Sequence, residues 1–191
     1  MDTSQTLLHA ALQVLDEDGV AQFSTRRICS IANVTAPTLY HHYGSADGLL
    51  SAAIAEAFAQ FLGSKKAAKP ATDPVTALRE GWDDYVGFAA ARPRLYGAMM
   101  GRILDGADVP AAKQGFALLI ERLTAIDAQG QLAADVETAA DLIWASANAA
   151  SLLYVTARLR KTAPPSAAVL ERIRTDALRS ILIPETKGLT S

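Results

Sequence analysis

The stretch from Asn33 to Ser45 constrains the fold of this chain more than any other. Thr35 is a favourable N-cap residue, and Pro37 suits the first turn of a helix, where a missing N–H costs little. Leu39 and Tyr43 are four residues apart and can face a core together, which leaves Tyr40 on the opposite side. The pattern predicts a short helix, about 13 Å long at ~1.5 Å per residue. Its outer face is unusually polar and suits a groove.

A second helix is predicted directly before this stretch. Ser24 is its N-cap, and Ile28 and Cys29 are among its inward positions. Asn33 follows, and asparagine tolerates the left-handed backbone conformation that a tight turn often needs. A helix, a tight turn and a short helix in this register form the helix-turn-helix pattern.

Helical periodicity continues along the rest of the chain, and strand-like alternation is absent, so we expect an all-α fold with about nine helices. The segment from Gly63 to Pro70 interrupts this pattern and is the best domain boundary. It separates residues 1–62, which hold three helices and the start of a fourth from residue 45, from residues 63–191, which form a helical bundle.

Composition narrows the function. A net charge of −2 and a pI near 5.9 argue against a generically basic nucleic-acid coat protein, although a specific DNA-binding protein needs only a local positive field. One cysteine cannot form an internal disulfide, and Cys29 is expected to be a small buried side chain. No leader opens the chain and no run approaches the ~20 apolar residues that span a bilayer, so a soluble cytoplasmic protein without membrane contact is expected.

Residues 5–62 resemble the DNA-binding domain of the TetR family of transcriptional regulators. The matching pieces are Phe23-Ser-Thr-Arg-Arg-Ile, Ala32-Asn-Val-Thr, Pro37-Thr-Leu-Tyr-His-His-Tyr, and Gly44-Ser followed by Asp47-Gly-Leu-Leu50. The remainder resembles the family only in architecture. The resemblance implies a homodimer that binds a palindromic double-stranded DNA operator. It also implies a small-molecule effector of unknown identity, bound in a ligand-binding and dimerisation domain at residues 63–191.

The resemblance also assigns DNA contacts to individual positions. Base-edge contacts would come from Arg26, Ala36, Pro37, Thr38, Tyr40 and His42. Phosphate contacts would come from Ser24 or Thr25, Tyr40, His41 and the backbone at Ser45, and Thr35 completes the DNA-binding set. Arginine can grip a guanine edge with two hydrogen bonds, and hydroxyls and helix N-termini are ordinary phosphate anchors. The alternative for Tyr40 and His41 is an ordinary exposed helix face, and His42 could equally be a structural histidine.

The chain departs from the family in its charge. Ala46 stands where the family commonly has a phosphate-binding lysine. Two arginines against six carboxylates give residues 1–62 a formal charge of −4. Each neutralised phosphate steepens the salt dependence of binding by about 0.9 in log–log slope. We therefore predict a shallow salt dependence and weak non-specific binding.

Aromatic, methionine and amide side chains of residues 63–191 are candidates for an effector pocket, since bundles bind ligands between helices. These candidates are Trp82, Tyr85, Phe88, Tyr96, Met99, Met100, Ile103, Phe116, Trp144 and Asn148. Aromatic stripes at helical spacing are more often plain core. The small-residue run Ala145-Ser-Ala-Asn-Ala-Ala-Ser151 either admits another helix or leaves room for a ligand.

Apolar side chains on the last two predicted helices form a candidate dimer interface. They are Leu152, Val155, Leu159, Leu170, Ile173, Ala177 and Ile181. Neither a cofactor nor a metal is expected, because all three histidines precede residue 43 and no metal-ligand spacing occurs.

The function that fits these patterns is a ligand-responsive transcriptional repressor, released from its operator by a small, mostly apolar molecule. The alternative keeps the same fold but places the regulator under the control of a protein partner. An enzyme is disfavoured, because no catalytic Ser/His/Asp or Cys/His set and no Gly-rich phosphate loop is apparent.

Overall fold

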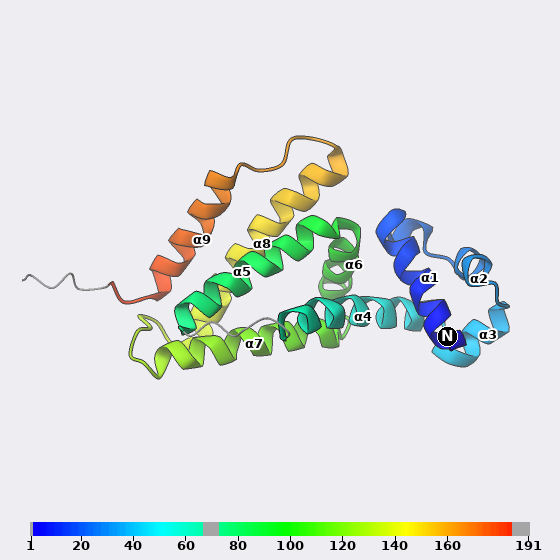
Figure 1. Ribbon diagram of the computed structural model, residues 1–191, viewed down its shortest axis with the longest axis horizontal. Coiled ribbons are helices and arrows are strands. Elements are labelled where there is room, and N and C mark those ends of the chain that lie inside the picture. The colour runs from blue at the N-terminus through cyan, green and yellow to red at the C-terminus, as the bar shows by residue number, and fades with distance from the viewer. Residues whose placement is uncertain (1, 67–72, 185–191) are drawn as a thin grey trace, which may run out of the picture. The chain divides into compact units, whose positions relative to one another are not determined.

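The computed structural model describes residues 2–66 and 73–184, and these residues fold almost entirely into α-helices (Figure 1). The elements are α1 Thr3–Glu17, the 3-10 helix η1 Val20–Gln22, α2 Thr25–Ala32, α3 Ala36–Tyr43, α4 Ala46–Lys66, α5 Pro74–Ala91, α6 Pro93–Leu104, α7 Pro110–Asp127, α8 Val136–Arg160 and α9 Ala167–Ile181. The predicted all-α class is confirmed. None of the helices within these ranges is both long and apolar enough to cross a membrane.

Side-chain caps start several of these helices, and the cap of α2 is the predicted Ser24. The Ser24 Oγ accepts from the Arg27 N–H at 3.4 Å at the start of α2. The Asp135 carboxylate accepts from the Thr138 N–H at 2.8 Å at the start of α8. These bonds satisfy N–H groups that the first helical turn leaves unpaired.

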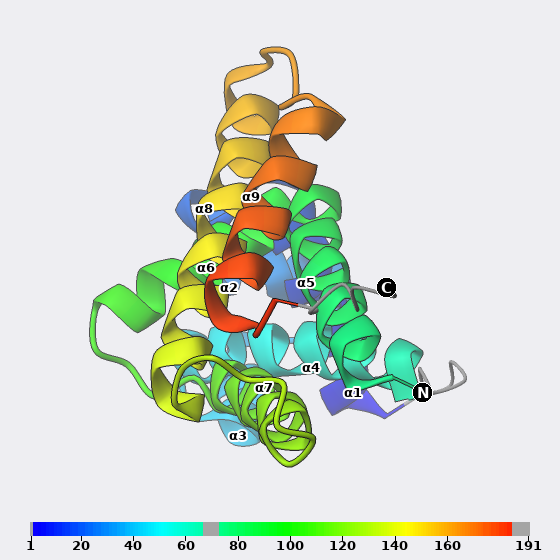
Figure 2. The same cartoon turned by 90° about the vertical axis from the view of Figure 1, so that its left-hand side faces the viewer.

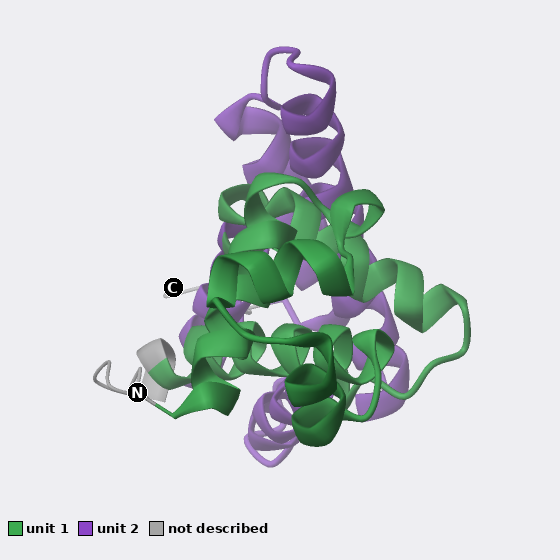
Figure 3. Cartoon of the chain, turned by 90° about the vertical axis from the view of Figure 1, so that its right-hand side faces the viewer, with its two compact units in different colours: residues 1–69, 88–113 green, residues 70–87, 114–191 purple. Residues whose placement is uncertain are grey.

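The helices group into two compact units, drawn in different colours in Figure 3. Unit 1 comprises residues 1–69 and 88–113, and unit 2 comprises residues 70–87 and 114–191. The division falls inside α5 and α7. Unit 1 therefore extends beyond residues 1–62 and includes α6.

In unit 1, α1 packs against α2, α3, α4 and α6. Its core side chains include Leu7, Leu15, Ile28, Leu39 and Leu49, all fully buried. Cys29 is buried beside them, and burial raises the pKa of its thiol, which favours the protonated, unreactive form.

In unit 2, the core gathers side chains of α5, α7, α8 and α9, among them Trp82, Leu123, Ile143 and Ile181. Helices α8 and α9 lie side by side, as the yellow and orange ribbons of Figure 2 show. The Ala133 N–H donates to the Ile181 carbonyl at 2.8 Å, which ties the segment before α8 to the end of α9.

Helix α4 continues through Gly63 to Lys66, although the sequence pattern predicts a break at Gly63. A glycine lowers helix stability by only about 1 kcal/mol relative to alanine, so flanking helix-forming residues can carry a helix across it. Residues 67–70 of the predicted linker lie outside the described residues.

Candidate nucleic-acid interface

The turn between α2 and α3 is built on Asn33. Its backbone adopts the left-handed conformation, with φ 53° and ψ 46°. The Val34 N–H then donates to the Cys29 carbonyl at 3.0 Å and closes α2. The predicted helix-turn-helix geometry is confirmed here, since this tight turn leads directly into α3.

The inner face of α3 is fixed by one apolar and one polar contact. Leu39 is fully buried. The Tyr43 hydroxyl donates to the Ser4 carbonyl at 2.8 Å and lies 2.9 Å from the Ser4 Oγ. Because Ser4 belongs to α1, this contact sets the rotation of α3 about its axis.

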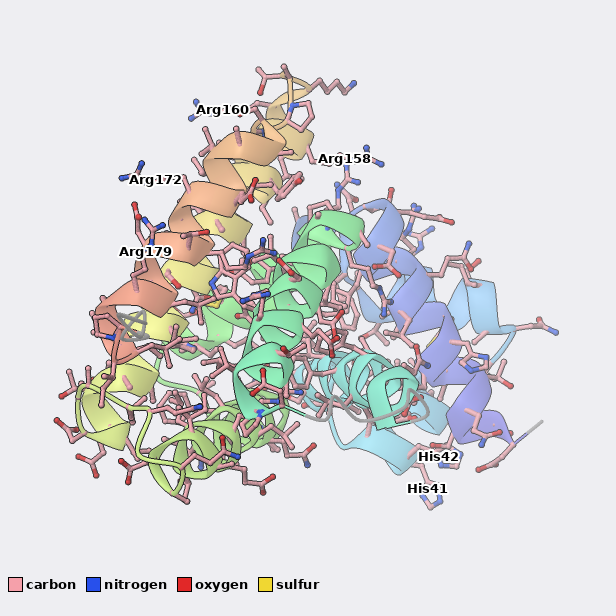
Figure 4. All side chains as sticks on the ribbon, turned by 60° about the vertical axis from the view of Figure 1, so that its left-hand side comes forward. His41, His42, Arg158, Arg160, Arg172 and Arg179 are labelled. Carbon is pink, nitrogen blue, oxygen red and sulfur yellow. The ribbon has the colours of Figure 1, made fainter. Side chains whose placement is uncertain are left out.

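The outer face of α3 is therefore free for a ligand. Tyr40 is 48% exposed, and Pro37, His41 and His42 are also exposed. Figure 4 shows both histidines projecting from α3, with their ring centroids 5.3 Å apart. This face offers a phenol and two imidazoles, and α3 carries no lysine or arginine.

The two arginines of α2 differ in their surroundings. Arg27 forms an ion pair with Asp18 at the end of α1. Arg26 is exposed, and no ion pair or hydrogen bond engages its side chain in the part of the chain that is described. The freely available positive charge beside α3 is thus that of Arg26.

Several side-chain hydroxyls of the predicted DNA-binding set already have partners inside the domain. The Thr35 and Thr38 hydroxyls lie 2.9 Å apart, so Thr35 stands at the N-cap position of α3 without bonding a helix N–H through its side chain. The Ser45 Oγ accepts from the Gly48 N–H at 2.9 Å. Ser24 caps α2 in the same way, while Thr25 and Ala36 are half-buried.

The start of α4 packs closely against the end of α3. A Cβ on Gly48 would collide with the Tyr43 carbonyl oxygen, so this position requires glycine. One residue earlier, Asp47 forms a two-bond ion pair with Arg102 of α6, with Nη2 and Oδ2 3.1 Å apart. This hydrogen bond holds the pKa of the Asp47 carboxyl below its ordinary value.

A second ionic contact joins α6 to α1. Arg92, the N-cap residue of α6, donates to the two Asp16 oxygens from Nε at 3.1 Å and from Nη2 at 2.6 Å. Sequence reasoning missed the contacts of Arg92 and Arg102. Each joins residues more than fifty positions apart, and no local pattern marks such pairs.

The predicted effector residues divide between the two units. In unit 1, Phe88, Tyr96 and Met99 are buried, while Met100 and Ile103 are half-buried. A shallow depression in this unit involves none of them. Its lining is Ser51, Ile54, Ala55, Arg102, Asp108, Val109 and Pro110.

In unit 2, two aromatic residues of α5 donate hydrogen bonds to α8. The Trp82 Nε1 donates to the Ser146 Oγ at 2.9 Å, and the Tyr85 hydroxyl donates to the Asn148 Oδ1 at 3.0 Å. Trp144 and Phe116 remain 40% and 37% exposed. Sequence reasoning named Trp82, Tyr85 and Asn148 but missed Ser146, since serines are common in helices that bind nothing.

The predicted dimer residues also divide by burial. Leu152 and Leu159 are 59% and 48% exposed on α8. Leu170, Ile173 and Ala177 are half-buried. Val155 and Ile181 are buried within the single chain and offer no surface to a second subunit. Each lies on the face of its helix that packs against the core of the same chain. Leu153 and Val169 are exposed instead.

Comparison with known proteins bears on both the domain and the whole fold. Residues 7–53 match the family model described as bacterial regulatory proteins, tetR family. A search of curated proteins gives no match.

Solved structures match along nearly the whole chain. A protein of unknown function from Rhodococcus sp. RHA1 superimposes with a TM-score of 0.79 at 20% identity, covering 96% of this chain and 97% of that one. A structure described as a tetR family transcription regulator from Shewanella sp. PV-4 has a TM-score of 0.69 at 20% identity, over 96% and 100% of the two chains. The multidrug binding protein EbrR, complexed with imidazole, has a TM-score of 0.66 at 20% identity, over 95% and 91%. These TM-scores show a shared fold, and at such low identities they show the fold alone.

The matched residues, 7–53, include α2, the turn at Asn33 and α3. The family consists of DNA-binding transcription regulators and not of enzymes. The N-terminal domain is therefore a DNA-binding domain of the TetR family of bacterial regulatory proteins, as shown by the match over residues 7–53.

Proposed function

We propose that this protein is a cytoplasmic, ligand-responsive transcriptional repressor that acts as a homodimer. Residues 1–62 would bind DNA, and residues 63–191 would bind the effector and a second subunit. The observation that carries the proposal is the exposed outer face of α3, which bears Tyr40, His41 and His42 while Leu39 and Tyr43 hold the inner face.

This face suits the major groove chemically. The Tyr40 hydroxyl and the imidazoles can bond phosphate or base edges, and Ala36 and Pro37 can contact a thymine methyl. Arg26 stands free beside them and can grip a guanine through O6 and N7. The N-terminus of α3 can meet a phosphate, because the helix dipole is positive there. The proposed set also keeps Ser24, Thr25, Thr35, Thr38 and Ser45.

Exposed leucines on α8 support a dimer. Leu152 and Leu159 are two turns apart on one face of α8 and are exposed, and Leu153 and the α9 residue Val169 are exposed as well. A two-fold dimer would present two α3 helices to a palindrome with half-sites about one helical turn, ~34 Å, apart.

Ion pairs of α6 supply a path for effector control. Arg102 is paired with Asp47 of α4, and Arg92 is paired with Asp16 of α1. A shift of α6 would therefore displace α4 and α1, which both belong to the DNA-binding domain. The effector would act by binding one of two dimer conformations better than the other. EbrR, which shares this fold, is described as a multidrug binding protein, and this description supports a small-molecule effector.

In vitro selection from random duplexes tests the proposal. The full chain should enrich an inverted repeat, and sedimentation should find one dimer on each selected duplex. Enrichment of no sequence, or of a motif without two-fold symmetry bound by a monomer, would contradict it. A small-molecule library that shifts neither thermal stability nor DNA affinity would favour control by a protein partner.

A further inference from the structure

The small-residue run Ala145–Ser151 of α8 contains three polar side chains, Ser146, Asn148 and Ser151. Side chains of α5 donate hydrogen bonds to the first two. Trp82 donates to Ser146 at 2.9 Å, and Tyr85 donates to Asn148 at 3.0 Å. Ser151 comes next, three residues or about 4.5 Å further along the helix at ~1.5 Å per residue.

Ser151 differs from the other two because its hydroxyl has no partner. It is fully buried, and it is the one buried polar residue of the described chain. Its Oγ makes no hydrogen bond. Helical serines usually bond a carbonyl one turn back, as Ser146 does to Ile143 at 2.8 Å and Ser180 does to Ala177 at 2.7 Å. A buried hydroxyl left unpaired is costly, and such a group calls for a partner that fits the site.

The side chains that precede Ser151 on α8 are small, whereas Tyr154 and Val155, one turn after it, are larger. Between Ala145 and Ser151, no side chain is larger than that of Asn148. Ala147 and Ala150, which flank Ser151 on the buried face, are themselves buried in the unit 2 core. The small-residue run and the unpaired hydroxyl are independent observations that point to the same place.

Among the described residues of unit 2, no charged side chain is buried, so none could pair with an ionic ligand in its interior. Figure 4 shows Arg158, Arg160, Arg172 and Arg179 projecting outward from α8 and α9. Arg174 is paired with Asp83.

Arg122, half-buried on α7, reaches over Gly81 of α5. Trp82 bonds Ser146 and Tyr85 bonds Asn148, so residues later in α5 lie beside residues later in α8. Gly81 precedes Trp82, whereas Ser151 follows Asn148, and Gly81 therefore lies away from Ser151. Desolvating a charged ligand beside Ser151 would therefore go uncompensated.

We propose that Ser151 is the polar anchor of the effector site and that the effector is an uncharged molecule with an apolar body and one hydroxyl or carbonyl group. This inference rests on the proposed effector control and specifies the chemistry of its ligand. The effector group would bond the Ser151 Oγ as Trp82 bonds Ser146.

Matched probes test this in the full chain. The neutral probes are 1-octanol and 2-naphthol, and the charged probes of the same body are octanoate, octylammonium and 2-naphthoate. At least one neutral probe should raise the melting temperature more than its charged counterparts do. Ser151→Ala should weaken the binding of that probe about tenfold by calorimetry. Without probe, Ser151→Ala should melt at the wild-type temperature or above it, because it removes an unpaired hydroxyl.

Ser146→Ala is the matched control, since it removes a hydroxyl that Trp82 engages. It should lower the melting temperature and leave the preference for neutral probes intact. The inference is overturned if charged probes bind as well as neutral ones, if no probe binds, or if Ser151→Ala binds the neutral probe like the wild type. A fall in melting temperature for Ser151→Ala alone would also overturn it, by revealing a structural partner. DNA binding by the same samples tests the proposed function separately, since the selected duplex should bind the wild type and both variants alike without probe.

Discussion

The Arg102 guanidinium donates to both carboxylate oxygens of Asp47, joining α6 to the first turn of α4. This hydrogen bonding lowers the pKa of Asp47. A carboxyl whose pKa is lower in the folded state adds stability above its unfolded value of about 3.9, and that stability disappears as the pH falls through the folded value.

Asp47→Asn should therefore be less stable than the wild type at pH 7, and the difference should shrink as the pH falls below about 4 and disappear below the lower folded pKa of Asp47. The loss should not exceed about 1 kcal/mol, because the carboxylate is largely exposed and screened by solvent. Urea unfolding from pH 7 to pH 3 measures it. Arg102→Gln should give a similar loss at pH 7, and the double variant should lose little more. Equal pH profiles for Asp47→Asn and the wild type would refute the coupling.

Gly48→Ala should destabilise the DNA-binding domain by about 2 kcal/mol, because the new Cβ meets a backbone carbonyl that cannot easily move. Gly63→Ala is the control within the same helix, since nothing lies within 4 Å of its added Cβ. That change should stabilise α4 by about 0.5–1 kcal/mol. Thermal unfolding of both variants checks the contrast, and equal effects would contradict the close packing of α4 against Tyr43.

Tyr43→Phe should lower the free energy of unfolding by about 1 kcal/mol, because it removes the hydrogen bond that the Tyr43 hydroxyl donates to the half-buried Ser4 carbonyl. Its operator affinity should also fall, because this bond sets the rotation of α3. Urea unfolding and fluorescence anisotropy measure the two effects. A stable variant with full DNA affinity would mean that Leu39 alone orients the helix.

The local parts of this fold could be predicted from the sequence because their causes are local. Asn33 and Ser24 each act on N–H or carbonyl groups within five residues, and the structure has both in the expected conformation or bond. Thr35 is the N-cap residue of α3 as predicted, but its hydroxyl contacts the Thr38 hydroxyl and makes no hydrogen bond to a helix N–H.

Contacts between distant residues could not be predicted in this way. Nothing near Asp47 marks Arg102 as its partner, and nothing near Ser151 shows that its hydroxyl is unpaired. Ile181 shows the same limit, since its periodicity fits a dimer surface and the core of one subunit equally well.

Operator affinity should depend only shallowly on salt. Arg27 is paired with Asp18, and Arg26 is the other strong base of residues 1–62. Few phosphates can then be neutralised, each adding about 0.9 to the slope of log affinity against log salt. Anisotropy titrations between 50 and 300 mM salt should give a slope shallower than about −6 for the dimer. A steeper slope would reveal basic contacts outside this surface.

The central claim is that the outer face of α3, with Arg26, binds the operator. The most direct test compares Arg26→Ala, Arg27→Ala and Tyr40→Ala by anisotropy on the selected duplex, with sedimentation to verify an intact dimer. Arg26→Ala and Tyr40→Ala should each lower affinity at least about tenfold, given about 1–3 kcal/mol for a good base contact. Arg27→Ala should change affinity much less, because Asp18 already engages that side chain. Wild-type affinity in folded, dimeric Arg26→Ala and Tyr40→Ala would contradict the claim.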